Sequence, residues 1–425
     1  MSYDTALRGP VAERIGEIAG ADIVVGIPCY NSERTIGHVI EMVSQGLWHH
    51  YSERDAVILV ADGGSTDDTR ETAARVPLEP RQERLVSIYR GIGGKGTALR
   101  SIFEAGERLG ARACMVVDSD LRSITGDWVR RLLEPVLNDG YDFVAPIYTR
   151  HKYDGTITNN IVYNLTRALY GRRIRQPIGG DFAFSRACSG YFMRQQIWDT
   201  DIARFGIDIW MTTGALITGA RVCQARLGVK VHDAKDPAAH LGPMFRQVLY
   251  TLFSLMEENE LYWKTVVGSE PTEVFGEDDG AQPEPVAVNH AALCRTFRDG
   301  HRRFGVLWQQ IFSPSVYAGI EQAALMPDDR LRIDIDIWVR LLYELAVTFH
   351  LWRSHRYKLL ELSTPLYLAR VASFINDTRN ADSAEAEQLV EEQAQAFEDR
   401  KMILIDLWDG SALQPPALSE GLTSL

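Results

Sequence analysis

Two aspartates, Asp118 and Asp120, flank Ser119 at the end of an apolar run. Carboxylates spaced this closely can both approach a hard divalent cation, which prefers oxygen ligands. Mg²⁺ or Mn²⁺ bridging a diphosphate is the usual partner of such a pair. The alternative is a helix cap or a turn, because this triplet is common by chance. Its position directly after a predicted strand favours metal binding.

Polar residues follow other predicted strands in the same way. Asp62 could accept hydrogen bonds from a base or a ribose, and Gly63 would let a flat ring approach the backbone. A plain turn capped by Ser65 is the alternative, and both interpretations can hold together. The first strand ends in Pro28, Cys29, Tyr30 and Asn31, where Tyr30 could border a nucleotide.

Two further candidate segments contain neighbouring glycines. Lys95 lies between Gly94 and Gly96 before a predicted helix, but the longer spacing of a Walker A loop is absent. A lysine on a flexible turn at a helix start still suits a diphosphate. Gly179 and Gly180 supply backbone freedom further along the chain.

Two isolated residues complete the set of candidates. Asp208 lies in an apolar stretch that opens a helix. It could be a solvated cap, or a buried and oriented carboxylate that binds sugar hydroxyls. His232 follows a short predicted strand. A lone histidine is usually structural, but beside a metal loop it is a plausible third metal ligand.

The elements that position these residues alternate between short apolar runs and helical patterns. Strands are predicted at residues 23–27, 56–61, 85–89 and 113–117, and helices at 32–45, 65–76 and 96–109, with Ser32 as the first N-cap. This alternation predicts an α/β fold, with a mainly parallel sheet and helices on both faces. Ligands of such sheets collect beyond the carboxyl ends of the strands, where the polar motifs fall.

The second half of the chain has a different character. Residues 268–287 are acidic and rich in proline and glycine, which predicts an exposed loop. Helical patterns follow at residues 289–304, 335–352 and 381–408, and the aromatic stripe of the second is typical of core or a subunit contact. We therefore expect a catalytic domain at residues 1–240 and a helical region at residues 241–425. The aromatic stripe also makes a homodimer a possible assembly.

Composition narrows the class of protein. The 425 residues are 45% apolar and 24% charged, as in an ordinary globular protein, and the net charge of -12 argues against nucleic-acid or anionic-membrane partners. Five scattered cysteines fit a reducing compartment better than disulfides or a zinc site. The N-terminus has no apolar signal region, and the apolar runs are too short to span a membrane. We expect a soluble, cytoplasmic protein.

Taken in order, these motifs resemble those of family-2-like glycosyltransferases with the GT-A fold. The segments that carry the resemblance, within about the first 240 residues, are IPCYNSERTIGHVI, VADGGSTDDT, GKG and VVDSDL. Further segments are similar to the mannosylglycerate, glucosylglycerate and glucosyl-3-phosphoglycerate synthases: GGKGTALR, VDSDLRSITGDWV, RQPIGGDFAFSR, FGIDIWM and GVKVHDAKDP. The helical C-terminal part resembles mannosylglycerate synthase more weakly.

The resemblance implies a role for each candidate. It places the nucleotide-diphosphate sugar on Pro28, Tyr30, Asn31, Asp62, Gly63, Lys95, Asp118, Ser119, Asp120, Gly179 and Gly180. It implies Mg²⁺ or Mn²⁺ on Asp118, Asp120 and His232. Lys95, Asp120 and Asp208 become the catalytic residues, with Asp208 holding sugar or acceptor hydroxyls. It also implies retention of configuration through a front-face attack, in which the leaving phosphate takes the proton.

The acceptor is expected on the segment from Tyr148 to Asn160. In the phosphoglycerate-using enzymes a loop arginine helps to hold the phosphate, and Thr156 occupies the matching position. Arg150 and the backbone of Gly155, Thr156, Ile157 and Thr158 instead resemble the carboxylate cradle of mannosylglycerate synthase. The segment therefore favours free D-glycerate over 3-phosphoglycerate as the acceptor. The phosphorylated acceptor stays an alternative, because its phosphate could bind to nearby basic residues: Arg167, Arg172, Arg173 and Arg175.

The expected activity is thus transfer of mannose or glucose, with a GDP-sugar favoured, to glycerate, making a glycosylglycerate compatible solute. The first alternative is a glucosyl- or mannosyl-3-phosphoglycerate synthase. A second is a dolichyl-phosphate-type transferase, whose acceptor is membrane-bound. A third is a nucleotide-sugar-binding protein without catalysis.

Overall fold

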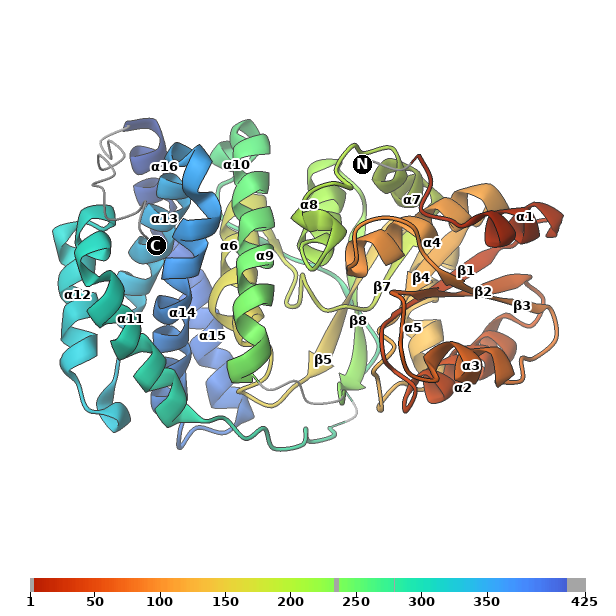
Figure 1. Cartoon of the computed structure of the whole chain (residues 1–425), viewed down its shortest axis with the longest axis horizontal. Coiled ribbons are helices and arrows are strands. Elements are labelled where there is room, and N and C mark those ends of the chain that lie inside the picture. Colours follow the sequence, from red (N-terminus) through yellow and green to blue (C-terminus); the bar gives the residue numbers. More distant parts are fainter. Residues whose placement is uncertain (1–3, 233–236, 279, 411–425) are drawn as a thin grey trace. The chain divides into compact units, whose positions relative to one another are not determined.

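The computed structural model describes residues 4–232, 237–278 and 280–410. They form two compact units (Figure 1). The first comprises residues 1–150, 174–234 and 271–284, and the second comprises residues 151–173, 235–270 and 285–425. This division differs from the predicted boundary at residue 240. Residues 151–173 join the helical unit, and residues 271–284 return to the sheet.

The first unit is built on an eight-stranded sheet in the order β10-β8-β5-β7-β4-β1-β2-β3. Its strands are β1 (Ile23–Cys29), β2 (Ala56–Asp62), β3 (Gln82–Ile88), β4 (Ala113–Val116), β5 (Phe143–Thr149), β7 (Phe182–Ser185), β8 (Val222–Val229) and β10 (Val274–Phe275). Among these, β7 alone runs antiparallel to its neighbours, β4 and β5. The mainly parallel sheet predicted from the sequence is confirmed.

Helices cover both faces of this sheet. They are α1 (Gly9–Glu17), α2 (Ile36–Tyr51), α3 (Thr69–Arg75), α4 (Lys95–Leu109), α5 (Gly126–Asn138), α7 (Arg186–Met193) and α8 (Ile207–Ile217), with the short helix η2 (Asp201–Ala203). Figure 1 shows α2 and α3 on one side of the strands and α4 and α7 on the other. Burial on both faces explains why β1 and β2 are continuous apolar runs.

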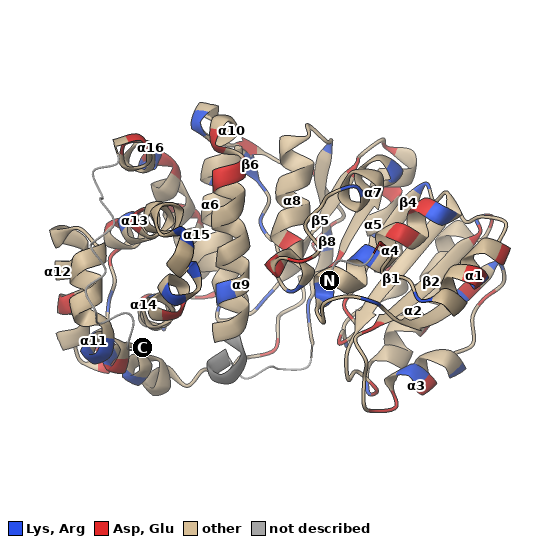
Figure 2. Cartoon of the chain, turned by 45° about the horizontal axis from the view of Figure 1, so that its top comes forward, with Lys and Arg blue, Asp and Glu red and all other residues tan. Residues whose placement is uncertain are grey.

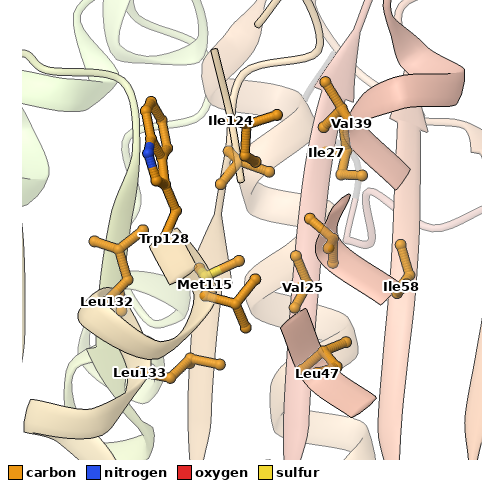
Figure 3. Close-up of a cluster of buried hydrophobic side chains, with 14 of the residues drawn as sticks. Val25, Ile27, Val39, Leu47, Ile58, Met115, Ile124, Trp128, Leu132 and Leu133 are labelled. Atoms are coloured by element: carbon orange, nitrogen blue, oxygen red, sulfur yellow. The ribbon is translucent and has the colours of Figure 1, made fainter. Parts of the chain in front are cut away.

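The core under α2 and α5 is a single cluster of buried side chains. Figure 3 shows Val25 and Ile27 of β1 beside Val39 and Leu47 of α2. Gly26 faces the opposite side, where a Cβ atom would lie 2.3 Å from the side chain of Ile102 in α4. The missing side chain lets α4 pack directly on β1.

Two predicted helix starts are wrong, for a reason that bears on the site. The helix α2 begins at Ile36 with Thr35 at its N-cap position, so Ser32 is not the cap. The helix α3 begins at Thr69, four residues after Ser65. Neither serine side chain caps a helix: Ser32 Oγ contacts Ser119 Oγ in another loop, and Ser65 Oγ donates to Asp62 in its own turn and accepts from the main-chain N–H of Asn31.

The second unit is helical, as predicted. It contains η1 (Thr158–Val162, a π-helix), α6 (Tyr163–Tyr170), α9 (Pro237–Glu258), α10 (Glu260–Thr265), α11 (His290–Ile311), α12 (Pro314–Leu325), η3 (Asp328–Arg330), α13 (Ile335–Leu351), η4 (Arg353–His355), α14 (Arg356–Asp377), α15 (Ser383–Asp399) and α16 (Lys401–Gly410), beside the short strands β6 (Arg172–Arg173) and β9 (Glu270–Pro271). The predicted helix at residues 381–408 is divided at Arg400. Trp338 and Phe349 of α13 are buried, which confirms the core interpretation of the aromatic stripe.

The segment 268–287 and the charged side chains belong to the surface features of the chain. The acidic segment 268–287 is not wholly a loop, because it contains β10, which pairs with β8. Figure 2 shows Lys and Arg interspersed with Asp and Glu along the helices of both units. Within the described ranges, no helix is long and apolar enough to cross a membrane.

Candidate functional site

The predicted donor residues lie at the carboxyl edge of the sheet in the first unit. Because β1 and β2 are parallel and pair Cys29 with Asp62, the loops that follow them emerge side by side. The main-chain N–H of Asn31 donates to Ser65 Oγ (2.8 Å), and Thr66 N–H donates to Asn31 Oδ1 (2.9 Å). Asn31 adopts a positive φ of 51°, which asparagine tolerates better than most residues. The two loops form one surface.

The loop after β4 joins the same surface through Ser119. Ser32 Oγ and Ser119 Oγ lie 2.8 Å apart, and the Thr35 hydroxyl donates to the Ser119 carbonyl oxygen at 2.7 Å. Ser119 is therefore buried between the neighbouring acids, Asp118 and Asp120. The structure thus brings together the predicted segments after β1, β2 and β4.

Asp62 points into the protein. One of its carboxylate oxygens accepts from the N–H groups of Gly64 (2.9 Å) and Ser65 (3.0 Å), and the other accepts from the Ser65 hydroxyl. The side chain is fully buried. Asp62 therefore holds the turn, which was the alternative to nucleoside binding, and a direct contact with a nucleoside stays a prediction.

Beside this turn lies an open aromatic surface. Pro28 is buried in β1, whereas Tyr30 is 62% exposed. A Cβ atom on Gly63 would lie 3.3 Å from the Tyr30 ring and 3.2 Å from the Tyr89 hydroxyl. An exposed ring next to a glycine offers a flat apolar surface on which a planar group could stack.

Lys95 lies at the centre of a cluster of charged groups. Its Nζ donates to Asp118 Oδ1 (2.8 Å), to the Gly180 carbonyl oxygen (3.1 Å) and to Asp208 Oδ2 (3.3 Å). Lys95 is the first residue of α4, whose next residue, Gly96, approaches η2. A Cβ atom on Gly96 would lie 1.8 Å from the Ile202 carbonyl oxygen, so glycine is required for this approach.

A second lysine, which the sequence analysis did not assign, occupies the other side of Asp118. Lys230 Nζ donates to Asp118 Oδ2 (3.0 Å), Asp181 Oδ2 (2.8 Å) and the Gly179 carbonyl oxygen (2.9 Å). Asp181 also accepts from the main-chain N–H of Asp118 at 2.7 Å and from the Tyr148 hydroxyl. The one sequence signal for Lys230 was a lysine within an apolar strand-like segment.

The predicted glycines support this cluster. Gly180 has a φ of +96°, and a Cβ atom there would lie 2.2 Å from Asp118 Oδ2. The carbonyl oxygens of Gly179 and Gly180 each accept from one of the two lysines. Their observed role is to bring the backbone to these lysines, and lining a sugar pocket stays a prediction.

The charges of the cluster are set by burial and by its ion pairs. Burial opposes the charged form of Asp118, but Lys95 and Lys230 outweigh it and hold the pKa of this carboxyl below its usual range. Burial also disfavours the charged ammonium of Lys95, yet Asp118 and Asp208 raise its pKa above the usual value. Burial raises the pKa of Asp208, and Lys95 only partly offsets this. Both partners of the Lys95–Asp118 pair are therefore charged at neutral pH.

Asp208 has one oxygen available for a ligand. The residue is buried near the start of α8, so the solvated-cap interpretation does not hold. Its Oδ2 accepts from Lys95, whereas Oδ1 is buried without a hydrogen-bond partner. An unsatisfied buried acceptor is costly, and a ligand hydroxyl would satisfy it.

The predicted metal ligands are only partly assembled. Leu121 forms an antiparallel bridge with His232, which brings the segment after β8 beside the loop that carries Asp120. Both oxygens of Asp118, however, are engaged by lysines. Among the residues that the structure describes, no three His, Cys, Asp or Glu side chains are grouped closely enough to hold a metal ion. The triad stays a prediction.

The two halves of the predicted acceptor site fall in different units. Arg150 belongs to the first unit, where its guanidinium lies over the Tyr148 ring at 5.2 Å. Residues 155–158 belong to the second unit and lead into η1. The Thr156 side chain is buried, and its hydroxyl lies 2.6 Å from the Tyr367 hydroxyl of α14. Ile157 and Thr158 are buried as well.

The chain is similar in sequence to known proteins. A sequence profile described as "Glycosyl transferase family 2" matches residues 24–197, which include the loops after β1, β2 and β4. The glucosyl-3-phosphoglycerate synthase of Mycolicibacterium paratuberculosis is 31% identical over 268 residues, covering 57% of this chain and 75% of that protein. The enzyme of the same name from Mycolicibacterium smegmatis is 29% identical, covering 57% of this chain and 80% of that protein.

Solved structures of the Mycobacterium tuberculosis glucosyl-3-phosphoglycerate synthase are also similar. The complex with Mg²⁺ and UDP is 26% identical, with a TM-score of 0.44, and the match covers 59% of this chain and 85% of that chain. The complex with Mn²⁺, UDP-glucose and phosphoglyceric acid is 26% identical, with a TM-score of 0.44, covering 60% and 86%. The sequence relatives and the family profile establish what the motifs implied: this chain belongs to glycosyl transferase family 2 and is a hexosyltransferase with a GT-A-like fold.

Proposed function

We propose that this enzyme transfers glucose from UDP-glucose to a hydroxyl of 3-phosphoglycerate. Relatives matched over 75% and 80% of their own length are glucosyl-3-phosphoglycerate synthases. The M. tuberculosis enzyme of that name, 29% identical in sequence, has been crystallised with UDP-glucose and phosphoglyceric acid. These relatives favour the first alternative from the sequence over the expected GDP-sugar and free glycerate.

The observation that carries the proposal is the pair of lysines bound to Asp118: Lys230, which is buried, and Lys95, whose side chain is 13% exposed. Negative charge builds on the departing nucleoside diphosphate during sugar transfer. Fixed cations in a buried site stabilise such charge without reorganisation. Lys95 also lies at the N-terminus of α4, where the helix dipole favours an anion.

The residues near Asp118 also suit a divalent cation. Carboxylate oxygens with one imidazole nitrogen suit Mn²⁺, and carboxylates alone suit Mg²⁺, so Asp118, Asp120 and His232 would hold such an ion. When bound, it would neutralise part of the charge on the diphosphate. Asp208 Oδ1 would accept from a hydroxyl of the sugar or of the acceptor. The acceptor proton would pass to the leaving phosphate, with retention of configuration.

Free glycerate is the second candidate acceptor, because of the residue at position 156. The family resemblance matches Thr156 to a position where the phosphoglycerate-using enzymes carry an arginine, and the Thr156 hydroxyl is engaged by Tyr367. The test is a donor-by-acceptor matrix: UDP-glucose, GDP-glucose and GDP-mannose against 3-phosphoglycerate and D-glycerate, each with Mg²⁺, Mn²⁺ or a chelator. Product would be identified by mass spectrometry and its anomeric configuration by NMR.

We expect the α-linked glucosyl-3-phosphoglycerate product from UDP-glucose, and none with the chelator. Product from glycerate but not from 3-phosphoglycerate would overturn the proposed acceptor. Turnover dependent on a lipid phosphate would favour the dolichyl-phosphate-type alternative.

The five cysteines are buried and unpaired, which supports a reducing, cytoplasmic location. Light scattering would test the homodimer.

A further inference from the structure

We propose that Tyr367 is a positioning residue for the acceptor: through Thr156 it fixes the acceptor loop, defined as residues 155–158. This inference rests on the proposed function and on the expectation, from the sequence resemblance, that this loop binds the acceptor. It assigns a role in substrate binding to the helical region, whose sequence carries no catalytic motif.

The contact between Tyr367 and Thr156 is short and buried. Their hydroxyl oxygens lie 2.6 Å apart, and both side chains are buried. The Tyr367 ring stacks on Phe245 of α9, with ring centroids 4.6 Å apart and an interplanar angle of 12°. The ring is therefore held independently of the hydrogen bond, and its hydroxyl is a fixed reference point for the loop.

A second anchor reaches the residue that follows the loop. Gln393 of α15 donates through Nε2 to the Asn159 carbonyl oxygen at 2.9 Å. The Oε1 atom of Gln393 accepts from Nε (3.0 Å) and Nη2 (2.6 Å) of Arg370. Arg370 lies three residues after Tyr367 on α14, so both project from one face of that helix. One face of α14 thus contacts the loop directly through Tyr367 and supports the residue after it indirectly, through Gln393.

The local backbone explains why such anchors are needed. The acceptor loop leads into η1, a π-helix, which is a rare conformation often found at functional sites. The Asn160 carbonyl oxygen accepts from Trp338 Nε1 at 2.8 Å, so another helix also supports this turn. A loop that positions a substrate must itself be held in place, and these contacts hold it.

Tyr343 provides a matched control. It is also fully buried, and its hydroxyl donates to the Phe397 carbonyl oxygen, far from residues 155–158 in the chain. Replacing either tyrosine by phenylalanine removes one buried hydroxyl and keeps the ring. The two variants should lose similar stability, and only one should affect the acceptor.

The experiment compares Tyr367→Phe, Tyr343→Phe and Thr156→Val in the full-length enzyme. For each we would measure the melting temperature, kcat and the KM values for UDP-glucose and 3-phosphoglycerate. We expect Tyr367→Phe to raise the acceptor KM about fivefold, the equivalent of one hydrogen bond. Its donor KM should stay within about twofold of the wild type. Tyr343→Phe should leave both KM values unchanged.

The double variant shows whether Tyr367 acts through Thr156. In the Thr156→Val background, Tyr367→Phe should have no further effect on the acceptor KM. Equal effects of the two tyrosine variants, or additive effects in the double variant, would overturn the inference alone. Absence of turnover by the wild-type enzyme with every donor and acceptor of the matrix would overturn the proposed function and this inference with it.

Discussion

Replacing Lys230 by methionine tests the charge balance of the cluster directly. Lys230 Nζ makes hydrogen bonds of 2.8–3.0 Å to Asp118, Asp181 and the Gly179 carbonyl oxygen, and its side chain is only 3% exposed. Methionine preserves most of the volume but removes a cation from the fully buried Asp181 and from Asp118, whose side chain is 25% exposed. Removing one partner of a buried ion pair costs about 3–5 kcal/mol. We therefore expect Lys230→Met to lower the free energy of unfolding by about 3 kcal/mol or more.

The assay is urea unfolding at pH 7, followed by circular dichroism, beside the KM for UDP-glucose. Arg130→Met is the control, because Arg130 pairs with Asp127 and Glu134 at the surface of the same unit. That change should cost less than about 1 kcal/mol. Adding Asp181→Asn to Lys230→Met should recover part of the loss, since it removes one unpaired charge. A cost for Lys230→Met no larger than that of the control would refute the reasoning.

Three further predictions concern the same cluster. Asp208→Asn should lower kcat on the order of 100-fold, because it disturbs the group that aligns a substrate hydroxyl. Urea unfolding should show that the stability of this variant stays within about 1 kcal/mol of the wild type. An unchanged kcat would count against this role. Gly180→Ala should cost at least about 2 kcal/mol, because its Cβ meets Asp118 at a positive φ, whereas Gly110→Ala, at a φ of +69° in open space, should cost about 1 kcal/mol by the same measurement. The folded-state pKa of Asp118 lies below its unfolded value, so its contribution to stability is present above about pH 4 and is lost as the pH falls below that. Unfolding measured from pH 3 to pH 7 should show this loss, and Asp118→Asn should show less of it.

Much of the first unit could be predicted because its signals are local. The apolar runs of β1, β2 and β4 identified buried strands, and the polar residues directly after them had to lie at one edge of a parallel sheet. Asp118 and Lys95 were found in this way, each at the end of an element whose type the sequence indicated. Helix starts were less predictable, since Ser32 contacts Ser119 and Ser65 accepts from Asn31, both in other loops that the local pattern does not include.

The partners of Asp118 depended on tertiary structure. Asp181 is adjacent to β7, the antiparallel strand inserted between β4 and β5, and Lys230 follows β8, beyond β5. No local pattern predicts which distant strand ends will meet, because strand order is set by long-range hydrogen bonding and packing. The same holds for Thr156 and Tyr367, which are 211 residues apart. Residue types and spacing determined the kind of chemistry, and the packing of sheet and helices determined which side chains share it.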